Sequence, residues 1–337
     1  MPTSDLTTLQ KLLITPQKII ITTHHKPDGD AMGSSLAMYH YLKQKGHQVH
    51  LITPTDYPNF LHWMPGNDDV IIYTESISKA HELLDESDLI FCLDFNALSR
   101  INDLGHYIKQ VTAKKIMIDH HLEPEGFESY RLWDIRACAT AELVYQFITE
   151  IMDDNRLINE IIATCLYVGI ISDSGSFRFP NTRPVVHRIA ADLMEKGAKN
   201  AEIHQLLFEN STEQRLRFLG FCLHEKLEIK PNLHTALITV SKNEIEAYKI
   251  TTGDTEGIVN FALSIKDIKM AAFIVERSDM VKLSLRSIGD VPVNEICSKY
   301  FNGGGHKNAA GGNSTESLER TIQKFHSILP EFSAYLQ

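Results

Sequence analysis

The sequence predicts an α/β protein in which an N-terminal domain with a parallel sheet is joined by helices to a smaller α/β domain. Three observations support this fold class. Apolar runs alternate with helical patterns in the first half, helical spacing alone continues from about residue 182 to residue 225, and strand-like runs return after residue 234. The length of 337 residues also fits about two domains.

Short apolar runs in the first half are typical of strands that are buried on both faces of a parallel sheet. They are residues 18–23, 48–53, 70–73, 89–93 and 115–118. Helices are expected at residues 31–45, 141–152 and 157–171. Thr140 stands where it could cap the second helix, and Glu142 is favourable in that helix's first turn. The third helix is apolar on most sides, which predicts that it is buried.

The rest of the chain completes the predicted domain order. Helices are expected at residues 187–196 and 213–226, followed by strands at 235–240, 270–275 and 281–285 with a helix at 256–263. The predicted boundaries are residues 1–181 for the first domain, 182–225 for a helical linker and 226–337 for the second domain.

Composition and charge argue against several classes of protein. Lys and Arg number 33 against 43 Asp and Glu, and no basic run suited to gripping long nucleic acid occurs. No apolar stretch is long enough to cross a bilayer, and the N-terminus lacks the features of a signal peptide. The five cysteines are scattered, without a Cys-x-x-Cys pair, which predicts buried free thiols and a cytoplasmic location.

Acidic residues and histidines follow three of the predicted strands. They are the segment 24–30 (HHKPDGD), Asp94 and the segment 119–121. Because ligands of open α/β sheets bind outside the carboxyl ends of the strands, we expect these groups to meet at one edge of the sheet. Carboxylates and imidazoles without thiolates suit manganese, magnesium or zinc, and a mixed set favours manganese. The pattern therefore predicts a metal site, with two ions.

Within the first segment, His24, Asp28 and Asp30 are the candidate ligands. Pro27 and Gly29 predict a tight loop, from which the two aspartates can point toward different ions. The alternative is an Asx-turn that closes the loop before a helix. Asp94 could bridge the ions through its two oxygens, although an aspartate after a strand is as often a helix cap.

Adjacent histidines at the end of a buried strand are costly unless they bind something. One of His120 and His121 could bind a metal while the other faces the substrate, with Asp119 as an orienting partner. The alternative is a pair of histidines on a surface loop. Asp173 follows an apolar helix and needs a partner there, which is either a metal or a hydrogen bond that ends the helix.

A glycine-rich stretch at residues 303–312 differs in spacing from known nucleotide-binding loops. Its glycines would let main-chain N–H groups approach a phosphate, and His306 and Lys307 would add donors. The alternative is a flexible surface loop. Arg286 closes a predicted strand and could clamp a phosphate through two hydrogen bonds.

Together these motifs resemble those of the DHH phosphoesterase superfamily. Residues 24–34 and 119–121 carry the N-terminal part of the resemblance, and residues 303–312 resemble the glycine-rich motif of the DHHA1 domain. The subgroup most similar in order and length is the nanoRNase type, a bifunctional oligoribonuclease and 3′-phosphoadenosine-5′-phosphate (pAp) phosphatase. The resemblance covers almost the whole chain and implies an active site in the cleft between the two domains.

The resemblance implies two manganese ions, or magnesium or another divalent cation in their place. One ion would be held by His24, Asp28 and Asp94, and the other by Asp30, Asp94, His120 and Asp173. Asp94 and His121 are the implied catalytic residues, with His121 near the substrate phosphate. The implied substrate-binding residues are Arg286, His306, Gly304, Gly305, Lys307 and Arg100.

The implied reaction is the hydrolysis of short RNA oligonucleotides to mononucleotides and of pAp to AMP and phosphate, without a covalent intermediate. Alternatives on the same two-metal site are hydrolysis of cyclic or linear dinucleotides and exopolyphosphatase activity. A nucleotide-binding sensor that has lost catalysis is an alternative of another class. Digestion of long DNA fits the acidic charge poorly, no membrane partner is expected, and a homodimer is compatible with the resemblance.

Overall fold

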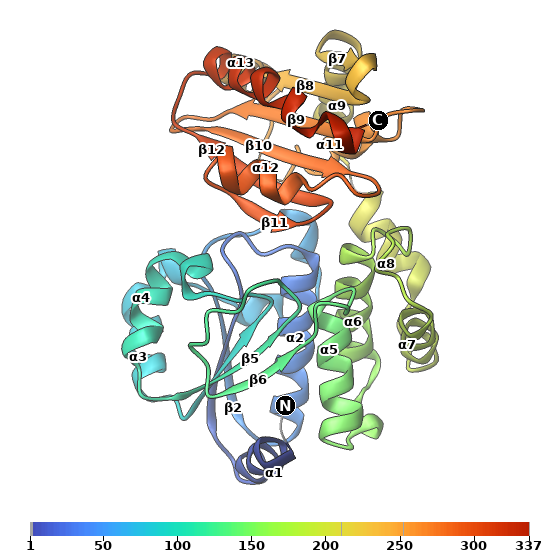
Figure 1. Cartoon of the computed structure of the whole chain (residues 1–337). Helices are drawn as coiled ribbons and strands as arrows, with labels where there is room; N and C mark the ends of the chain where they lie inside the picture. Colours follow the sequence, from blue (N-terminus) through green and yellow to red (C-terminus); the bar gives the residue numbers. More distant parts are fainter. Residues whose placement is uncertain (1–2, 210, 252, 337) are drawn as a thin grey trace. The chain divides into compact units, whose positions relative to one another are not determined.

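The computed structural model describes residues 3–209, 211–251 and 253–336, which divide into two compact units (Figure 1). The first unit is Met1–Asn210 and the second is Ser211–Gln337. The helices of the predicted linker, including one at residues 200–208 that was not predicted individually, are shared between the two units. Helices α7 (Pro184–Glu195) and α8 (Asn200–Phe208) belong to the first unit, and α9 (Glu213–Glu225) belongs to the second.

The first unit contains a six-stranded sheet in the order β3-β2-β1-β4-β5-β6, in which every neighbouring pair is parallel. The strands are β1 (Lys18–Thr22), β2 (Gln48–Thr53), β3 (Ile71–Ile72), β4 (Leu89–Leu93), β5 (Lys114–Asp119) and β6 (Tyr130–Trp133). The strand order changes direction between β1 and β4. In open α/β sheets this is the place where ligands bind, outside the carboxyl ends of the strands.

Helices cover both faces of this sheet (Figure 1). They are α1 (Thr3–Leu12), α2 (Gly29–Gln44), α3 (Ile77–Asp85), α4 (Asn102–Gln110), α5 (Thr140–Gln146) and α6 (Glu160–Asp173), together with α7 and α8. Ile19 and Ile21 of β1 pack in one hydrophobic cluster with α2, α5 and α6, whereas Ile20 packs in another with α3 and α4. Because both faces of the strand are buried, its apolar run is continuous rather than alternating.

Several local expectations need correction. Strand β6 was not expected, and β3 covers two residues of the predicted run 70–73. The helix predicted at 141–152 ends as a π-helical turn, Phe147–Ile151. Thr140 does not cap this helix, because it is the first residue of α5 and Ala139 occupies the N-cap. The hydroxyl of Thr140 turns instead to a buried carboxylate described below.

The second unit has a mixed sheet in the order β11-β12-β10-β9-β8-β7, in which only the pair of β8 and β9 is parallel among the described strands. The strands are β7 (Leu227–Lys230), β8 (Thr235–Val240), β9 (Met270–Glu276), β10 (Val281–Ser287), β11 (Gly304–His306) and β12 (Ala309–Ser314). The remaining helices are α10 (Lys242–Ala247), α11 (Ile258–Leu263), α12 (Val293–Tyr300), α13 (Leu318–Ile328) and α14 (Ser333–Leu336).

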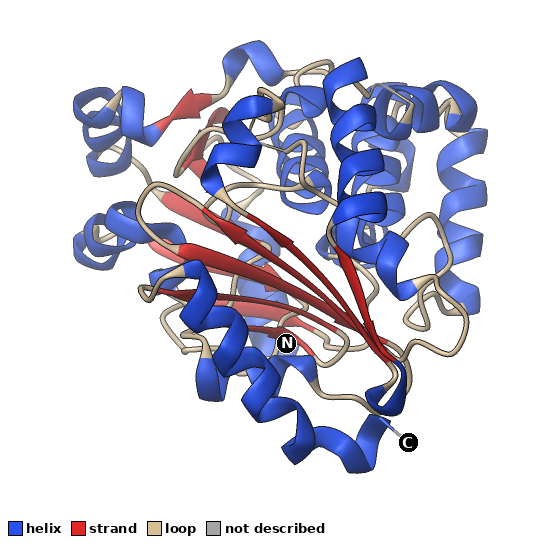
Figure 2. Ribbon diagram, turned by 90° about the horizontal axis from the view of Figure 1, so that it is seen from above, coloured by secondary structure: helices blue, strands red, loops and turns tan. Residues whose placement is uncertain are grey.

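Two hydrophobic clusters cover the two faces of this mixed sheet. Leu283 and Leu285 pack with α12 and α13 on one face, and Phe273 packs with α9 and α11 on the other. Figure 2 shows the C-terminal helices running along one side of the red strands to the point marked C. Along β10, buried and half-buried residues alternate, as expected for a strand with one face in the core.

The glycine-rich stretch forms the hairpin of β11 and β12 rather than a loop. A Cβ at Gly303 would lie 2.0 Å from the carbonyl oxygen of Gly311, and one at Gly312 would lie 2.8 Å from Cβ of Phe301. These glycines therefore allow close packing of the main chain. Gly304, by contrast, has no atom within 4 Å of the position of a Cβ, so packing does not explain it.

All five cysteines are buried and free, as predicted. Among the helices of the described residues, none combines the length and the apolar character that crossing a membrane requires.

Candidate active site

The loop after β1 brings His24 and Asp28 together at the start of α2. Nδ1 of His24 donates a hydrogen bond to the carbonyl oxygen of His25 (2.9 Å), so Nε2 faces the site. This Nε2 lies 3.8 Å from Oδ1 of Asp28. The same Oδ1 accepts hydrogen bonds from the main-chain N–H groups of Asp30 and Ala31 and caps α2. Asp28 therefore forms the Asx-turn and is still a candidate ligand, so the two interpretations are compatible.

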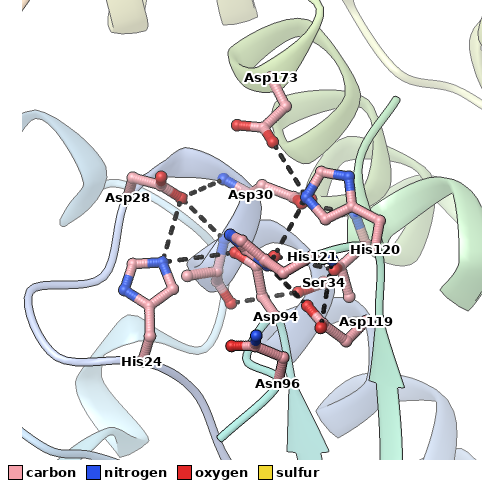
Figure 3. Close-up of polar contacts among 12 residues, drawn as sticks. His24, Asp28, Asp30, Ser34, Asp94, Asn96, Asp119, His120, His121 and Asp173 are labelled. Carbon is pink, nitrogen blue, oxygen red and sulfur yellow. Dashed lines mark hydrogen bonds and ion pairs between the residues drawn. The ribbon is translucent and has the colours of Figure 1, made fainter. Parts of the chain in front are cut away.

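Asp94 lies between two histidines (Figure 3). Its Oδ2 is 3.4 Å from Nε2 of His24, and its Oδ1 is 3.5 Å from Nε2 of His120. The residue is 2% exposed and has a φ of 64°, in the left-handed region that aspartate tolerates better than most residues. Oδ1 also accepts a hydrogen bond from the hydroxyl of Thr140 (2.8 Å). The carboxylate thus presents one oxygen to each of two donor groups.

His120 is buried, so the alternative of a surface histidine is wrong for this residue. Its Nδ1 donates to the carbonyl oxygen of Ala137 (3.1 Å), which leaves Nε2 to face the carboxylates. Nε2 lies 3.3 Å from Oδ2 of Asp173 and 4.0 Å from Oδ2 of Asp30. Asp173 is the last residue of α6, so the buried helix delivers its carboxylate to the site, as Figure 3 shows.

Asp30 is fully buried and is held by the first turn of α5. Oδ2 accepts from the N–H of Thr140 (2.6 Å), and Oδ1 accepts from the N–H of Ala141 (2.9 Å). The N-terminus of a helix offers such unpaired N–H groups, and its dipole favours a negative charge. This arrangement fixes the carboxylate even though it belongs to another helix, α2.

His121 is held by Asp119, the residue that precedes the two adjacent histidines. Its Nδ1 donates to Oδ1 of Asp119 at 2.7 Å, and the indole Nε1 of Trp133 donates to the carbonyl oxygen of His121 (2.7 Å). Asp94, Asp119 and His121 also form a compact group that could hold an ion. The short hydrogen bond to Asp119 gives His121 the orienting partner that the sequence predicted.

The carboxylates of this site do not all respond to burial in the same way: the pKa of Asp94 is lowered by its contacts with His120 and His24, whereas that of Asp30 is raised. Burial, together with the charges of Asp94 and Asp173, holds the pKa of Asp30 well above its usual range. Burial alone lowers the pKa of His24, but the contacts with Asp28 and Asp94 outweigh it and raise the pKa to about 10. Protonated imidazoles thus partly offset the excess of negative charge, and divalent cations would do so more completely.

The donor chemistry fits two divalent cations. Donor atoms of His24, Asp28 and Asp94 lie within 4.8 Å of one another, as do those of Asp30, Asp94 and His120. Asp94 belongs to both groups. The donors are carboxylate oxygens and imidazole nitrogens, which suit manganese, magnesium or zinc.

The candidate substrate residues of the second unit lie across the hairpin. Arg286 of β10 and His306 of β11 are both in register with Ala309 of β12. Residues opposite each other in neighbouring strands project from the same face of a sheet, so Arg286 and His306 lie on one face with a small residue between them. Gly304 and Gly305 precede His306 in β11.

The other two candidates have separate surroundings. Nζ of Lys307 lies 2.6 Å from Oδ1 of Asp290, in a surface depression of 730 Å³ within the second unit. Arg100 of the first unit contacts the loop after β1 through its carbonyl oxygen, which accepts from the N–H of His25 (2.8 Å).

Sequence reasoning missed the contacts that hold the candidate ligands in place. These contacts involve Ala137, Thr140, Ala141, Glu142, Trp133 and Arg183. The run of small residues at 137–141 before an acidic residue was the available signal, since small side chains let the main chain approach other groups. Nothing local shows which carboxylate the chain would approach.

Comparison with known proteins identifies two families in the chain. Residues 18–170 match the family described as "DHH family, N-terminal domain", and residues 235–333 match the "DHHA1 domain". The chain therefore belongs to the DHH family of phosphoesterases. Asp173 and Arg183 lie beyond the matched N-terminal range.

Named relatives cover most of the chain. It is 31% identical over 293 residues to the bifunctional oligoribonuclease and PAP phosphatase NrnA of Thermus thermophilus, across 87% of this chain and 83% of the relative. It is 25% identical over 318 residues to NrnA of Bacillus subtilis, across 93% and 95%. The crystal structure of an exopolyphosphatase-related protein from Bacteroides fragilis matches with a TM-score of 0.95 at 36% identity, across 99% of this chain and 97% of that one.

Proposed function

We propose that the protein is a metal-dependent phosphoesterase that hydrolyses short oligoribonucleotides to mononucleotides and pAp to AMP and phosphate. The observation that carries the proposal is the position of the Asp94 carboxylate, which has one oxygen facing His24 and the other facing His120. Two relatives that match most of the chain bear the name bifunctional oligoribonuclease and PAP phosphatase. The site and the relatives thus support the same reaction class.

Two manganese ions are the proposed cofactors, with magnesium or another divalent cation as a substitute. One would be held by His24, Asp28 and Asp94, and the other by Asp30, Asp94, His120 and Asp173. When bound, such a pair supplies Lewis acidity that offsets the charge developing on a phosphoryl group. The protein's part is to keep both donor sets in place, which the hydrogen bonds to Asp30, Asp94 and His120 support.

His121 is proposed to stabilise the phosphoryl oxygens of the substrate. Because Nδ1 donates to Asp119, Nε2 is the ring nitrogen that can meet a substrate oxygen. The imidazole is oriented before the substrate arrives, so little reorganisation is needed when charge develops in the transition state.

Arg286 and His306 are proposed to bind a substrate phosphate in the second unit. Their common register with Ala309 supports this role, because the small side chain leaves room between two donors on one face. Main-chain N–H groups of Gly304 and Gly305 would add to this contact, and Lys307 would contribute charge. Arg100 is proposed as a substrate-binding residue of the first unit. With a formal charge of −10, the chain suits a short substrate held by a few placed cations.

Hydrolysis of phosphoanhydrides is a second candidate function. It is favoured by the match to the Bacteroides fragilis structure, which is described as exopolyphosphatase-related. The same donor sets would serve this reaction, since the charge that develops on the phosphoryl oxygens is similar.

Product analysis tests the proposal. The full chain, stripped of metal with a chelator and then supplied with Mn²⁺, is given pAp, a 5′-phosphorylated RNA dinucleotide, a cyclic dinucleotide and polyphosphate in parallel. We expect AMP from pAp and mononucleotides from the RNA. Turnover of polyphosphate or of the cyclic compound alone would replace the proposed substrate. No turnover of any of the four, despite bound Mn²⁺, would favour a sensor.

A further inference from the structure

An ion pair between a buried carboxylate and a partly exposed arginine has no role in the reaction as proposed above. Glu142 of α5 is fully buried, and its Oε1 accepts a hydrogen bond from Nη2 of Arg183. Its Oε2 accepts from the main-chain N–H of Cys138 (2.8 Å). Arg183 is the N-cap residue of α7 and is partly exposed. A carboxylate is rarely buried in this way unless it is paired, so the two side chains depend on each other.

The pair holds a segment, residues 137–141, that contacts three of the candidate ligands. The carbonyl oxygen of Ala137 orients His120, and the hydroxyl of Thr140 donates to Asp94. The N–H groups of Thr140 and Ala141 both donate to Asp30. Cys138 lies within this segment, and its N–H donates the hydrogen bond that the carboxylate of Glu142 accepts. The segment supplies no candidate ligand itself, yet it determines where three of them lie.

We propose that Glu142 and Arg183 are positioning residues that set the affinity of the site for divalent cations. The inference rests on the metal site of the proposed function. The carboxylate of Glu142 fixes the N–H of Cys138, and the hydrogen bond from Arg183 holds that carboxylate in place. Loss of either partner frees the 137–141 segment, so that Asp30, Asp94 and His120 lose their shared geometry. Arg183 lies beyond residue 170, outside the matched DHH range, so a helix that follows this range completes the site.

The contacts of Glu142 and its neighbours converge on the segment that positions the candidate ligands, which distinguishes a positioning role from general stabilisation of the fold. A second hydrogen bond reaches the same segment, from Nδ2 of Asn181 to the carbonyl oxygen of Cys138 (3.2 Å). Residues 181 and 183 therefore fix the segment from the chain that leads into α7. Groups that orient metal ligands typically change metal affinity by about 10- to 100-fold when they are replaced.

The test measures Mn²⁺ binding by titration calorimetry on the full chain after removal of metal. Glu142→Gln and Arg183→Met are expected to bind Mn²⁺ about 10- to 100-fold more weakly than the wild type. Arg183→Lys keeps the charge and should recover most of the affinity. Turnover of Glu142→Gln should rise toward the wild-type value at excess Mn²⁺. The matched control is Arg136→Met, which removes the pair between the exposed Arg136 and the half-buried Asp134 (2.9 Å) and should leave affinity unchanged.

Metal-free thermal melts and circular dichroism distinguish the outcomes. Wild-type affinity in folded Glu142→Gln and Arg183→Met would overturn the inference, even if their metal-free melting temperatures fell, because the pair would then only stabilise the fold. If Glu142→Gln does not fold, the Mn²⁺ affinities of Arg183→Met and Arg183→Lys test the inference instead. Arg183 is partly exposed, so we expect its variants to fold. A wild type that binds no Mn²⁺ would overturn the proposed function itself.

Discussion

The carboxylate of Asp30 fills the space that a side chain at position 169 would need. A Cβ added to Gly169 would lie 2.8 Å from Oδ1 of Asp30 and 2.5 Å from Cβ of Ala141. Gly33 of α2 lies equally close to α6, since a Cβ added to Gly33 would lie 2.6 Å from the carbonyl oxygen of Cys165. Helices α2, α5 and α6 therefore meet where the main chain leaves no room for a methyl group, and a candidate metal ligand stands at the contact.

Gly169→Ala is expected to damage both stability and the site. The added methyl group must push Asp30 or α5 aside, and overpacking of this kind costs about 1–3 kcal/mol. Urea unfolding of the metal-free protein measures the loss, and Mn²⁺ titration measures the displaced ligand. Gly220→Ala is the matched control, because position 220 is also helical and has no atom within 4 Å of a Cβ. This change should stabilise the protein by about 0.5–1 kcal/mol. Equal effects of the two substitutions would contradict the packing argument.

Asp94→Asn is expected to remove turnover while the fold remains. Asparagine tolerates the left-handed backbone of this residue and can still accept from Thr140, so the change mainly removes charge. Loss of several kcal/mol of charge stabilisation corresponds to about a 10³-fold fall in kcat. The increase in melting temperature on addition of Mn²⁺ should also disappear. Substantial turnover by a folded Asp94→Asn protein would be incompatible with a bridging role.

His120 and His121 should differ in what their loss affects. His120→Ala removes a nitrogen that faces three carboxylates, so Mn²⁺ binding should weaken. His121→Ala should bind Mn²⁺ nearly as well as the wild type, with kcat reduced by about 10²- to 10³-fold. Titration calorimetry and steady-state kinetics separate the two effects. If His121→Ala loses Mn²⁺ instead, the compact group of Asp94, Asp119 and His121 holds an ion.

The stability of the first unit should depend on pH through Asp154. Its Oδ2 accepts from Nζ of Lys45 and from the hydroxyl of Tyr41, both at 2.6 Å. Burial raises the pKa of Asp154, but these hydrogen bonds and the charge of Lys45 outweigh it and lower the pKa below its usual value. A lowered pKa means that the ionised carboxylate stabilises the folded state above the ordinary Asp pKa of about 3.9, and that this contribution is lost as the pH falls through the folded value.

Asp154→Asn is therefore expected to cost about 1.5–3 kcal/mol at neutral pH, because the hydrogen bonds involve charged groups. The cost should shrink once the pH is below the ordinary pKa of aspartate. Urea unfolding of the wild type and the variant, at neutral pH and at a pH below the ordinary pKa of aspartate, measures the difference in the free energy of unfolding. Glu86→Gln, which removes an exposed pair with Lys18, provides a control with little expected effect. A cost for Asp154→Asn that is independent of pH would indicate lost packing rather than charge.

The strands and the meeting of the acidic clusters could be predicted because both depend on local patterns. Ile19, Ile20 and Ile21 are apolar since each faces a helix-covered side of the sheet, and this produces a continuous run. The carboxyl ends of parallel strands share one edge of the sheet, so the sequence alone predicts that His24 and Asp94 meet there.

The supporting contacts could not be predicted because they join distant parts of the chain. Thr140 is a good N-cap residue by type, and only the fold shows that its hydroxyl meets Asp94 instead. Strand β6 escaped prediction because its residues are half-buried or exposed, without the apolar run of the central strands. The hairpin of β11 and β12 is rich in glycine, which is typical of loops, and its pairing depends on β10.

The candidate ligands extend along the chain from His24 to Asp173, and the neighbouring strands β1 and β4 are joined through β2 and β3. We expect contacts between such distant residues to form late, since a long loop must close before they are made. The complete donor set is therefore absent until the first unit is nearly folded. A cation held by these side chains would therefore slow unfolding and leave the folding rate almost unchanged, so that it would lengthen the lifetime of the native state rather than guide its formation.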